Sequence, residues 1–437
     1  MTGPSPADDS PQHLVAERDL RNAECEDESM NILVLNAGSS SLKFEVIAVG
    51  PKEDVLDEHR QLISGVVEDI GKQTTFSLLE NKEVVQREKI KVSDYGTATQ
   101  WLLNWLDAGD FHNVPRLRNL AAVGHRVVHG ADRFTESVFI DAEVISGIEA
   151  LEDLAPLHNA PAVDVIRASR DVLGTAVPMF AVFDTAFHCC LPPQASSYPL
   201  PFELSRKHHI RRYGFHGISH EYLAWRYARI TDQPLESVTI ITLHLESGCS
   251  ACAIRRGQSV DTSMGLTPLE GLMMGMRSGD IDPAIVGYLA RKEEVGVERV
   301  EEWLNKESGL LGVSGRSHDT RELMKLLDED ERVRLALELF CYRLRKYIGA
   351  YLAALGGAQA VVFGGGIGED TPFVRARSCE DFSWCGLTID PARNERTITC
   401  EGRITTDDAR LNAYVIPVEE GLLIAQQVAR CLSESES

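Results

Sequence analysis

The chain has 437 residues, of which 43% are hydrophobic and 25% are charged, and this balance is typical of a soluble globular protein. Its length exceeds one ordinary hydrophobic core and predicts two domains. The formal net charge of −22 argues against nucleic acid or an anionic membrane as a partner. No apolar run reaches the roughly 18 residues that a membrane-spanning helix needs. We therefore expect a cytoplasmic protein whose anion sites are built from a few concentrated cationic groups.

The first ordered element is expected at Asn31, because residues 1–30 are rich in Pro, Asp, Glu and Ser and show no apolar period. That composition predicts a disordered acidic extension, and it lacks the basic flank and apolar core of a secretory signal. Residues Ile32–Ile47 then read as strand, Gly/Ser turn and strand, and Ile240–Ile254 repeats this layout. Two such hairpins suggest a duplicated α/β domain, although a chance pair explains the pattern equally well.

The segments between and after the hairpins alternate strand-like and helix-like patterns, which is the order of an α/β fold. The expected strands are Ala121–Val128, Pro178–Phe183 and Ala360–Phe363, and the expected helices are Ala162–Val172, Glu221–Ile230, Asp328–Leu355 and Gly421–Leu432. The strand at Ala360–Phe363 runs directly into a glycine-rich loop, Gly364–Gly368.

Two small-residue turns could approach a phosphate. The turn Asn36–Lys43 offers hydroxyls, backbone N–H groups and one lysine. Taken alone, it is better explained as an ordinary Ser-rich hairpin. The loop Gly364–Asp370 would let a flat ligand or a pyrophosphate lie against the backbone. It is not the dinucleotide fingerprint, because Glu369 stands where the last glycine would fall.

Three cationic or donor side chains stand between glycines: Arg126, His216 and Arg277. A mostly buried guanidinium needs an anionic partner. Each residue alone could belong to a structural ion pair or a turn, but three of them in an acidic chain favour a shared anionic ligand. Asp184 ends an apolar strand, where its carboxylate can meet Mg²⁺ or a reacting group.

Other patterns give weaker evidence of function. Cys249 and Cys252 form a C-x-x-C in an apolar strand without a second pair, so they are expected to be small buried thiols, as are Cys189 and Cys190. The stretch from Gly65 to residue 72 is one residue too long for a phosphate-binding P-loop and lacks the metal-binding hydroxyl.

Taken together, the motifs resemble those of the acetate kinase family, which belongs to the actin, Hsp70 and sugar-kinase superfamily. The likeness runs from about Asn31 to the C-terminus. Its signatures occur in this order: NAGSSSLKF, GHRVVHG, APLHN, FDTAFH, RRYGFHG, SVDTSMGLTPLEGLMMG with RSGDIDP, and GGGIGE.

The resemblance implies two duplicated ribonuclease H-like α/β domains with the active site in the cleft between them. With the acidic extension at 1–30 outside the likeness, it implies an N-terminal domain at 31–182 completed by a helix at 421–437, and a C-terminal nucleotide-binding and dimerisation domain at 183–420. The implied reaction is a reversible, direct in-line transfer between ATP and acetate, giving acetyl phosphate and ADP, with Mg²⁺ (or Mn²⁺ in its place) and a homodimeric enzyme. Because acetate is already ionised at pH 7, no base is needed, and Asp184 is better read as an organiser of metal or water.

The resemblance also assigns residue roles. The implied catalytic residues are Asp184, His216, Arg277, Arg126 and His158, and the acetate pocket is Arg126, Val128, Leu157, Phe215 and Pro268. The implied ATP contacts are Ser39, Ser41, Lys43, His244, Leu245, Glu246, Ser247, Gly248, Asp319, Thr320, Arg321, Gly366, Ile367, Gly368, Glu369 and Asp370, and the metal ligands are Asn36 and Glu420.

The sequence departs from the family in the second hairpin turn, where Glu246 and Ser247 replace a usual Gly and Asn. Glu246 could point away, recruit a second Mg²⁺ or basic neighbours, or change the phosphoryl donor or the activity. Met276 and the Asn159–Pro161 segment also depart from the pattern near the acyl pocket. These departures leave open a propionate- or butyrate-preferring kinase, another phosphoryl donor, and a disabled nucleotide-binding homologue.

Overall fold

The computed structural model describes residues 29–38, 40–50, 59–80, 83–109, 111, 114–152, 155 and 159–436, so residues 1–28 of the expected extension lie outside it. The strands are β1 (Met30–Ala37), β2 (Ser41–Val49), β3 (Arg60–Glu68), β4 (Thr75–Glu80), β5 (Glu83–Lys89), β6 (Ala122–Val127), β7 (Val138–Phe139), β8 (Met179–Phe183), β9 (Thr239–Leu245), β10 (Cys249–Arg255), β11 (Gln258–Thr262), β12 (Ala360–Gly364), β13 (Gly402–Arg403) and β14 (Asn412–Val415).

The α-helices are α2 (Tyr95–Ala108), α3 (Ala142–Glu149), α4 (Asn159–Leu173), α5 (Pro193–Ser196), α6 (Phe202–Lys207), α7 (Gly217–Ile230), α8 (Ala284–Lys292), α9 (Val297–Lys306), α10 (Gly309–Ser314), α11 (Thr320–Met324), α12 (Glu331–Leu355), α13 (Gly366–Asp370), α14 (Pro372–Ser378), α15 (Pro391–Arg396) and α16 (Glu420–Glu436). Short 3₁₀ turns are η2 (Leu117–Asn119), η4 (Ala186–His188), η5 (Leu235–Ser237) and η6 (Ser383–Cys385). No helix in these ranges is both long and apolar enough to cross a membrane.

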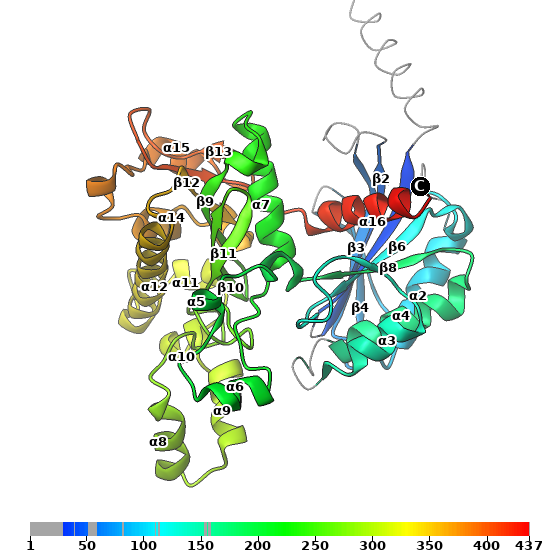
Figure 1. The fold of residues 1–437 in the computed structure, drawn as a ribbon, viewed down its shortest axis with the longest axis horizontal. Helices are drawn as coiled ribbons and strands as arrows, with labels where there is room; N and C mark the ends of the chain where they lie inside the picture. The colour runs from blue at the N-terminus through cyan, green and yellow to red at the C-terminus, as the bar shows by residue number, and fades with distance from the viewer. Residues whose placement is uncertain are drawn as a thin grey trace, which may run out of the picture.

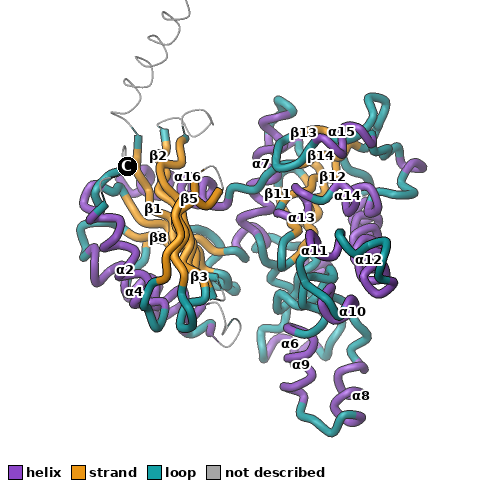
Figure 2. Tube along the Cα trace, turned by 180° about the vertical axis from the view of Figure 1, so that it is seen from behind, coloured by secondary structure: helices purple, strands orange, loops and turns teal. Residues whose placement is uncertain are grey.

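The strands form two sheets, one in each half of the molecule (Figures 1 and 2). The first has the order β5-β4-β3-β2-β1-β6-β8-β7 and the second β11-β10-β9-β12-β14-β13. In both sheets the leading hairpin is antiparallel, and its first strand pairs in parallel with a later strand: β1 with β6 and β9 with β12. The shared order β3-β2-β1-β6-β8 and β11-β10-β9-β12-β14 confirms the duplication that the two hairpins suggested.

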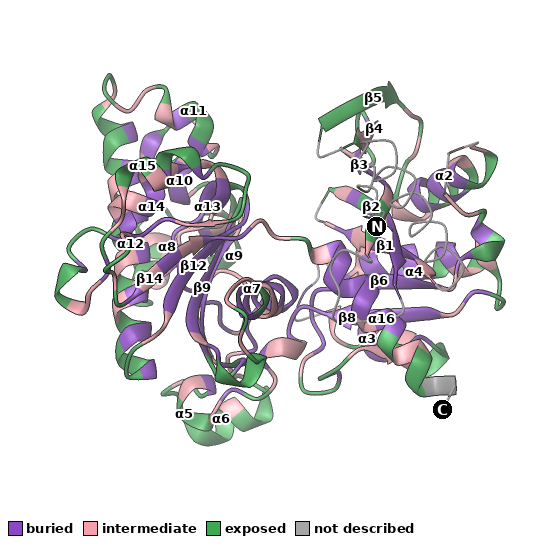
Figure 3. Ribbon diagram, turned by 90° about the horizontal axis from the view of Figure 1, so that it is seen from above, coloured by how far each residue is buried: buried purple, intermediate pink, exposed green. Residues whose placement is uncertain are grey.

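Both sheets are buried on both faces, which explains why their central strands read as apolar runs rather than alternating ones. Leu33 and Leu35 of β1 pack with α2 and α4, while Ile32 and Val34 belong to a central cluster with α7 and α16. That same cluster contains the inner residues of β9, β10 and β12. Beyond the second sheet, α12 closes a third cluster. The layers are therefore α2/α4, sheet, α16/α7, sheet and α12 (Figure 1). Figure 3 shows the buried sheets in each half and the exposed edge strand β5.

The chain passes between the two halves after β8 and again before α16. Although α16 follows β14 of the second sheet, it packs against β1, β2 and β6 of the first (Figure 1). A glycine at position 124 in β6 makes room for it, because an added Cβ would lie 2.8 Å from Ile424 and 3.0 Å from Val428. The expected strands and helices are confirmed, with α4, α7 and α16 extending a few residues beyond their expected bounds. Helix α12 begins at Glu331 rather than at Asp328, because Asp330 caps its N-terminus.

Candidate active site between the two sheets

Three adjacent parallel strands of the first sheet bring polar side chains to their carboxyl ends, the usual ligand-binding edge of such a sheet. Asn36 lies opposite Arg126 in the β1–β6 register, and Asp184 directly follows β8. Arg126 Nε donates to Asp184 Oδ1 at 3.0 Å, its Nη2 donates to Asp184 Oδ2, and its Nη1 donates to Asn36 Oδ1 at 3.0 Å. From 384 positions away in sequence, Glu420 at the start of α16 accepts from Asn36 Nδ2 at 3.5 Å.

Arg126 and Glu420 stabilise each other's charged form, whereas at Asp184 burial outweighs the attraction of Arg126 and raises the pKa of the carboxyl group. Burial alone would lower the pKa of Arg126, but the carboxylates of Asp184 and Glu420 outweigh it, and the pKa rises. Burial would likewise raise the pKa of Glu420, yet Arg126 and His244 bring it down to about 2, so Glu420 is ionised at neutral pH. Three N–H groups of Arg126 are used here, and the rest of the guanidinium remains for an incoming carboxylate.

A tight loop carries His216 into the same region. His216 has a left-handed backbone with φ of 56° at the start of α7. Residues other than glycine adopt this conformation uncommonly, and often at functional sites. The next residue, Gly217, donates its N–H to the Asp184 carbonyl at 2.8 Å, and an added Cβ there would lie 2.1 Å from that oxygen. The sequence Phe-His-Gly therefore fixes His216 relative to Asp184.

His216 and Arg277 flank one point beside Gly248. A Cβ on Gly248 would lie 3.4 Å from His216 Nε2 and 3.7 Å from Arg277 Nη1. Burial lowers the pKa of His216 well below its ordinary value, and the neighbouring charges of Arg126 and Arg277 add to this, so its imidazole is neutral. Burial also lowers the pKa of Arg277. Arg277 Nη1 donates to the Pro268 carbonyl at 3.1 Å, and no carboxylate among the described residues pairs with it.

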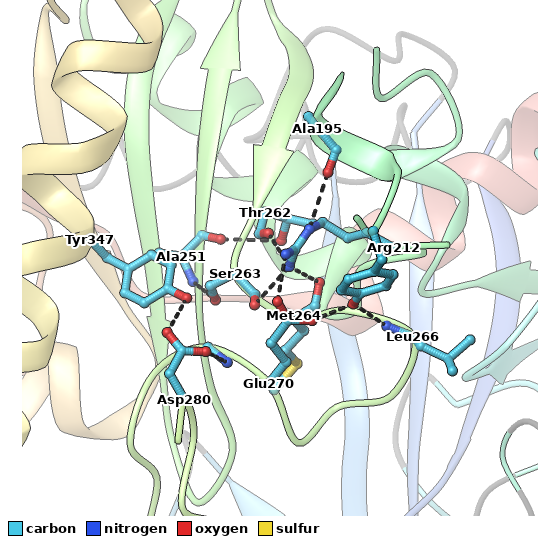
Figure 4. A network of polar contacts seen from close by, with 12 residues as sticks. Ala195, Arg212, Ala251, Thr262, Ser263, Met264, Leu266, Glu270, Asp280 and Tyr347 are labelled. Atoms are coloured by element: carbon cyan, nitrogen blue, oxygen red, sulfur yellow. Dashed lines mark hydrogen bonds and ion pairs between the residues drawn. The ribbon is translucent and has the colours of Figure 1, made fainter. Parts of the chain in front are cut away.

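The loops that carry these donors are held by Arg212, a residue that sequence reasoning did not single out. Arg212 Nη1 donates to the carbonyls of Thr262, Ser263 and Met264 at 3.0, 3.0 and 3.1 Å, and its Nη2 donates to Glu270 at 2.6 Å (Figure 4). Burial alone would lower the pKa of Arg212, but the Glu270 carboxylate outweighs it and raises it. Arg212 is the second arginine of the motif RRYGFHG. The carbonyl groups that it binds lie too far away in the sequence to be recognised from the motif.

The expected acetate pocket is assembled only in part within the described residues. Val128 and Phe215 are buried in one cluster, and Pro268 lies beside Arg277. Leu157 and His158 lie outside the described residues. Of the departures, Met276 is exposed, whereas Asn159 is buried and exchanges two hydrogen bonds with the backbone of His129, at 3.0 and 3.1 Å.

Two pockets open beside the cluster, and each is lined from both halves of the molecule. One, of about 470 Å³, is lined by Asn36, Lys43, Glu420, His244 and Glu246 together with the face of β2 and β3. The second, of about 550 Å³, unites half of the expected ATP contacts: its lining includes Glu246, Ser247, Asp319, Thr320, Arg321, Gly366, Ile367 and Asp370.

Other expected ATP contacts lie elsewhere. Leu245 is fully buried, and Gly368 and Glu369 face inward: the Gly368 carbonyl accepts from Arg375, and Glu369 Oε1 accepts from the Val418 N–H at 3.1 Å. Ser41 closes the first hairpin turn through its carbonyl, and Ser39 is outside the described residues.

Glu246 stands where the two pockets meet. Its side chain is exposed, it lines both pockets, and its charge is one of those that raise the pKa of Arg126. The Glu246 N–H donates to the Gly248 carbonyl at 3.0 Å, so the turn is closed on itself despite the replaced residues.

The site offers hard oxygen ligands to a small cation, but few of them. Glu420 is ionised, whereas the Asn36 amide oxygen is engaged by Arg126. Within the described ranges, no group of three or more His, Cys, Asp or Glu side chains could hold a metal ion. This donor set fits Mg²⁺, which is usually bound by one or two carboxylates together with substrate phosphates and water.

Four further polar groups were not found from the sequence. Ser219 donates to Glu420, and a chain of hydroxyls and imidazoles runs behind His216: Ser250, His220 and Thr242. The sequence feature that could have pointed to this chain is the presence of polar residues inside the apolar strands β9 and β10.

Most of the chain is similar to acetate kinases. Residues 31–426 match the model of the acetokinase family. The acetate kinase of Solibacter usitatus is 49% identical over 408 residues, covering 92% of this chain and 98% of that protein, and the acetate kinase of Chloroherpeton thalassium is 45% identical, covering 93% and 100%.

Solved structures agree with these matches. The crystal structure of Porphyromonas gingivalis acetate kinase is 36% identical with a TM-score of 0.85, covering 92% of this chain and 100% of that one. A propionate kinase from Francisella tularensis is also 36% identical, with a TM-score of 0.82 and coverage of 91% and 98%. The fold is therefore the two-domain fold of the actin, Hsp70 and sugar-kinase type, and the chain belongs to the acetokinase family of carboxyl phosphotransferases.

Proposed function

We propose that this protein is an acetate kinase, which transfers a phosphoryl group reversibly between ATP and acetate to give acetyl phosphate and ADP. The observation that carries the proposal is the convergence of His216 Nε2 and Arg277 Nη1 beside Gly248, next to the Arg126 cluster. A cationic group without a carboxylate partner, placed beside a neutral hydrogen-bond donor, suits the charge of a transferring phosphoryl group.

In this proposal Arg126 binds the acetate carboxylate, and Asp184 holds the guanidinium in place through their paired hydrogen bonds. The methyl group lies against Val128, Phe215 and Pro268, with Leu157 and His158 as further proposed contacts. A carboxylate oxygen attacks the γ-phosphorus in line while the bond to the β-phosphate oxygen breaks, and ADP carries away that electron pair. Acetate enters ionised, so no group on the enzyme needs to remove a proton.

His216 and Arg277 act on the phosphoryl oxygens as charge builds up during transfer. His216 acts as a neutral donor, because burial and its cationic neighbours keep it unprotonated. Removing one donor of this kind typically costs about 2.7–4 kcal/mol of barrier. We assign no phosphoenzyme, because a direct transfer uses every group present.

We place the nucleotide in the larger pocket and its phosphate chain toward the smaller one. Asp319, Thr320, Arg321 and residues 366–370 would contact ATP there, and Ser39, Ser41, Lys43 and residues 244–248 would approach the phosphates. Mg²⁺, with Mn²⁺ as a substitute, supplies neutralisation of the phosphate charge when bound. Glu420 is its proposed ligand, and Asn36 becomes one if its oxygen exchanges Arg126 for the metal.

With ATP placed in this way, the exposed carboxylate of Glu246 faces the phosphate chain. We propose that its carboxylate weakens the hold on the phosphoryl donor unless a cation lies between them, so that this enzyme needs more free Mg²⁺ than one with glycine there. Its exposure and its position between the two pockets support this.

We also propose a cytoplasmic homodimer. No described cysteine forms a disulfide, which suits a reducing compartment. Helix α8 has no buried residue although it carries Ile285 and Tyr288, and Phe202 on α6 is 69% exposed, so apolar surface in this half is available to a second copy. The proposed division is a domain at 31–182 completed by residues 421–437, and a domain at 183–420.

The test is an assay of the purified protein with ATP, Mg²⁺ and acetate, propionate or butyrate, in which hydroxylamine traps the acyl phosphate as a hydroxamate. We expect the highest kcat/KM with acetate. A higher value with propionate or butyrate would change the substrate, and ATP binding without any hydroxamate would refute the kinase.

A further inference from the structure

A buried chain of hydrogen bonds runs from the second sheet to His216. His216 Nδ1 lies 2.8 Å from Ser250 Oγ, Ser250 Oγ lies 2.8 Å from His220 Nε2, and His220 Nδ1 lies 2.7 Å from Thr242 Oγ1. His216 and His220 are one helical turn apart at the start of α7, and the two hydroxyls come from the neighbouring strands β10 and β9. Thr242, Ser250 and His220 are fully buried, while His216 reaches the cleft.

Burial lowers the pKa values of both His216 and His220 well below their ordinary value. Each ring therefore has one N–H and one bare nitrogen. Ser250 has one hydrogen and two lone pairs, and it stands between two imidazoles. If it accepted from both rings, its own hydrogen would be buried without an acceptor, so it donates to one ring and accepts from the other. Two arrangements then keep all three hydrogen bonds, and they differ in the direction in which every hydrogen points.

The far end of the chain decides between them. The Thr242 hydroxyl has no hydrogen-bond partner other than His220 among the described residues. If His220 Nδ1 carried the hydrogen, the Thr242 hydrogen would be buried without an acceptor, which costs about 1–3 kcal/mol. If Thr242 donates instead, only acceptor capacity is left unused, and a buried acceptor tolerates this better than a donor.

We propose that His220 and Ser250 are positioning residues that fix His216 as its Nε2–H tautomer, with the Thr242 hydroxyl at the far end of the chain. Thr242 donates to His220 Nδ1, His220 Nε2–H donates to Ser250, and Ser250 donates to His216 Nδ1. The remaining hydrogen of His216 then sits on Nε2, the atom that lies beside Arg277 at Gly248. The opposite arrangement would present a lone pair to the phosphoryl oxygens. This inference rests on the proposed function for the role of His216, but the tautomer itself does not depend on it.

The first readout is the His216 tautomer in the protein without substrate, measured by long-range ¹H–¹⁵N correlation of histidine-labelled enzyme. We expect wild type to show Nε2–H. Ser250→Ala removes the hydroxyl that donates to His216 Nδ1 and is expected to populate the Nδ1–H tautomer of His216. Thr242→Val should keep the wild-type tautomer, because a bare His220 Nδ1 is tolerated better in the core than a buried N–H without an acceptor. Ser259→Ala is the matched control, because it removes a similar His–Ser contact of 2.7 Å on His188, outside the chain.

The second readout is kinetic. Loss of one preorganised donor costs about 10²–10³ in kcat, which sets the upper bound for variants that only misdirect His216. We expect Ser250→Ala to lower kcat about 10–100-fold, with the KM for ATP and for acetate each within about twofold. Thr242→Val should change kcat by less than about threefold, because it leaves the hydrogen on His216 Nε2.

Two results would overturn the inference: an Nδ1–H tautomer for His216 in wild type, or a Ser250→Ala variant that keeps both the Nε2–H tautomer and the kcat of wild type. Failure of the proposed function looks different. A His216→Ala variant with normal kcat would remove His216 from the mechanism while leaving the tautomer measurement unchanged.

Discussion

The two halves of the molecule use one strand order for opposite chemistry. In the first sheet, Asn36 lies opposite Lys43 in the hairpin and beside Arg126 in the parallel strand. In the second, the corresponding positions hold His244, Ser250 and Gly364. The first half therefore concentrates full charges at its strand ends, whereas the second offers an imidazole, a hydroxyl and bare backbone.

This difference matches what each half is proposed to hold. The charged end suits a small carboxylate and a metal-bound phosphate, which demand strong point charges. The bare end suits a flat ligand: an added Cβ on Gly365, whose φ is 74°, would lie 2.7 Å from the Leu245 carbonyl, so backbone packs on backbone beneath the larger pocket. A duplicated fold thus separates two roles by changing a few side chains at equivalent positions.

The largest effect is expected from a substitution at the charged strand ends of the first half. Arg126→Ala leaves Asp184, whose side chain is 1% exposed, buried without its partner. Removing one member of a buried ion pair typically costs about 3–5 kcal/mol of stability. We expect a lower free energy of unfolding in urea as well as loss of activity. The surface pair Arg316–Asp330 provides the control, since Arg316→Ala should change stability by less than about 1 kcal/mol. Equal losses in the two variants would contradict the buried pair's role.

Arg277→Ala separates catalysis from stability. Because Arg277 has no carboxylate partner among the described residues, its removal leaves no buried charge uncompensated. We expect kcat to fall by at least about 100-fold with an unchanged unfolding midpoint. Hydroxamate kinetics and a urea titration on the same preparation check this, and a near-normal kcat would take Arg277 out of the mechanism.

Glu246→Gly makes the second turn resemble the bare backbone around it. Repulsion between a carboxylate and a phosphate at about 4 Å ranges from roughly 1 to 4 kcal/mol with the degree of screening. We expect the KM for ATP to fall about fivefold or more and the Mg²⁺ concentration at half-maximal rate to fall with it. Glu246→Gln removes the charge but keeps the size, so it should behave like the glycine variant. Unchanged ATP and Mg²⁺ dependence in both would mean that Glu246 does not meet the phosphates.

The smallest expected effect lies where the halves touch. Gln427 of α16 donates to Glu221 of α7 at 2.9 Å and accepts from Ser137 at 2.7 Å. Burial raises the pKa of Glu221 from 4.5 to about 7, so the folded protein prefers its protonated form. Stability from this group is therefore full below about pH 4.5 and is lost as the pH rises through 7.

Glu221→Gln should consequently be more stable than wild type above pH 7, on the order of 1 kcal/mol, and equal to it near pH 4.5. Thermal melting across this range checks the sign. A variant that is destabilised by the same amount at every pH would point to lost packing instead of a buried charge.

The sequence predicted what local patterns encode and missed what distant contacts decide. Hairpins, α12 and the strand before the glycine loop follow from apolar periodicity, and ordered motifs identified the cluster around Arg126. The Arg212 network and the Thr242–His220 contact join segments more than 20 residues apart. No period or propensity records such contacts. The direction of Glu246 was equally unreadable, because it depends on how the two halves face each other.

Helix α16 has a consequence for how the protein is made. It covers β1, β2 and β6 and brings Glu420 to the cluster, yet about 240 residues separate it from the end of β8. At the usual 5–20 residues per second, the ribosome needs roughly 10–50 s for that stretch. During that time the face of the nascent first sheet that includes Ile32 and Val34 lacks its cover by α16. The second half can close on its own sheet before the first half is complete. The part synthesised first therefore finishes folding last. Chaperones that shield apolar sheet surface can bind during this interval.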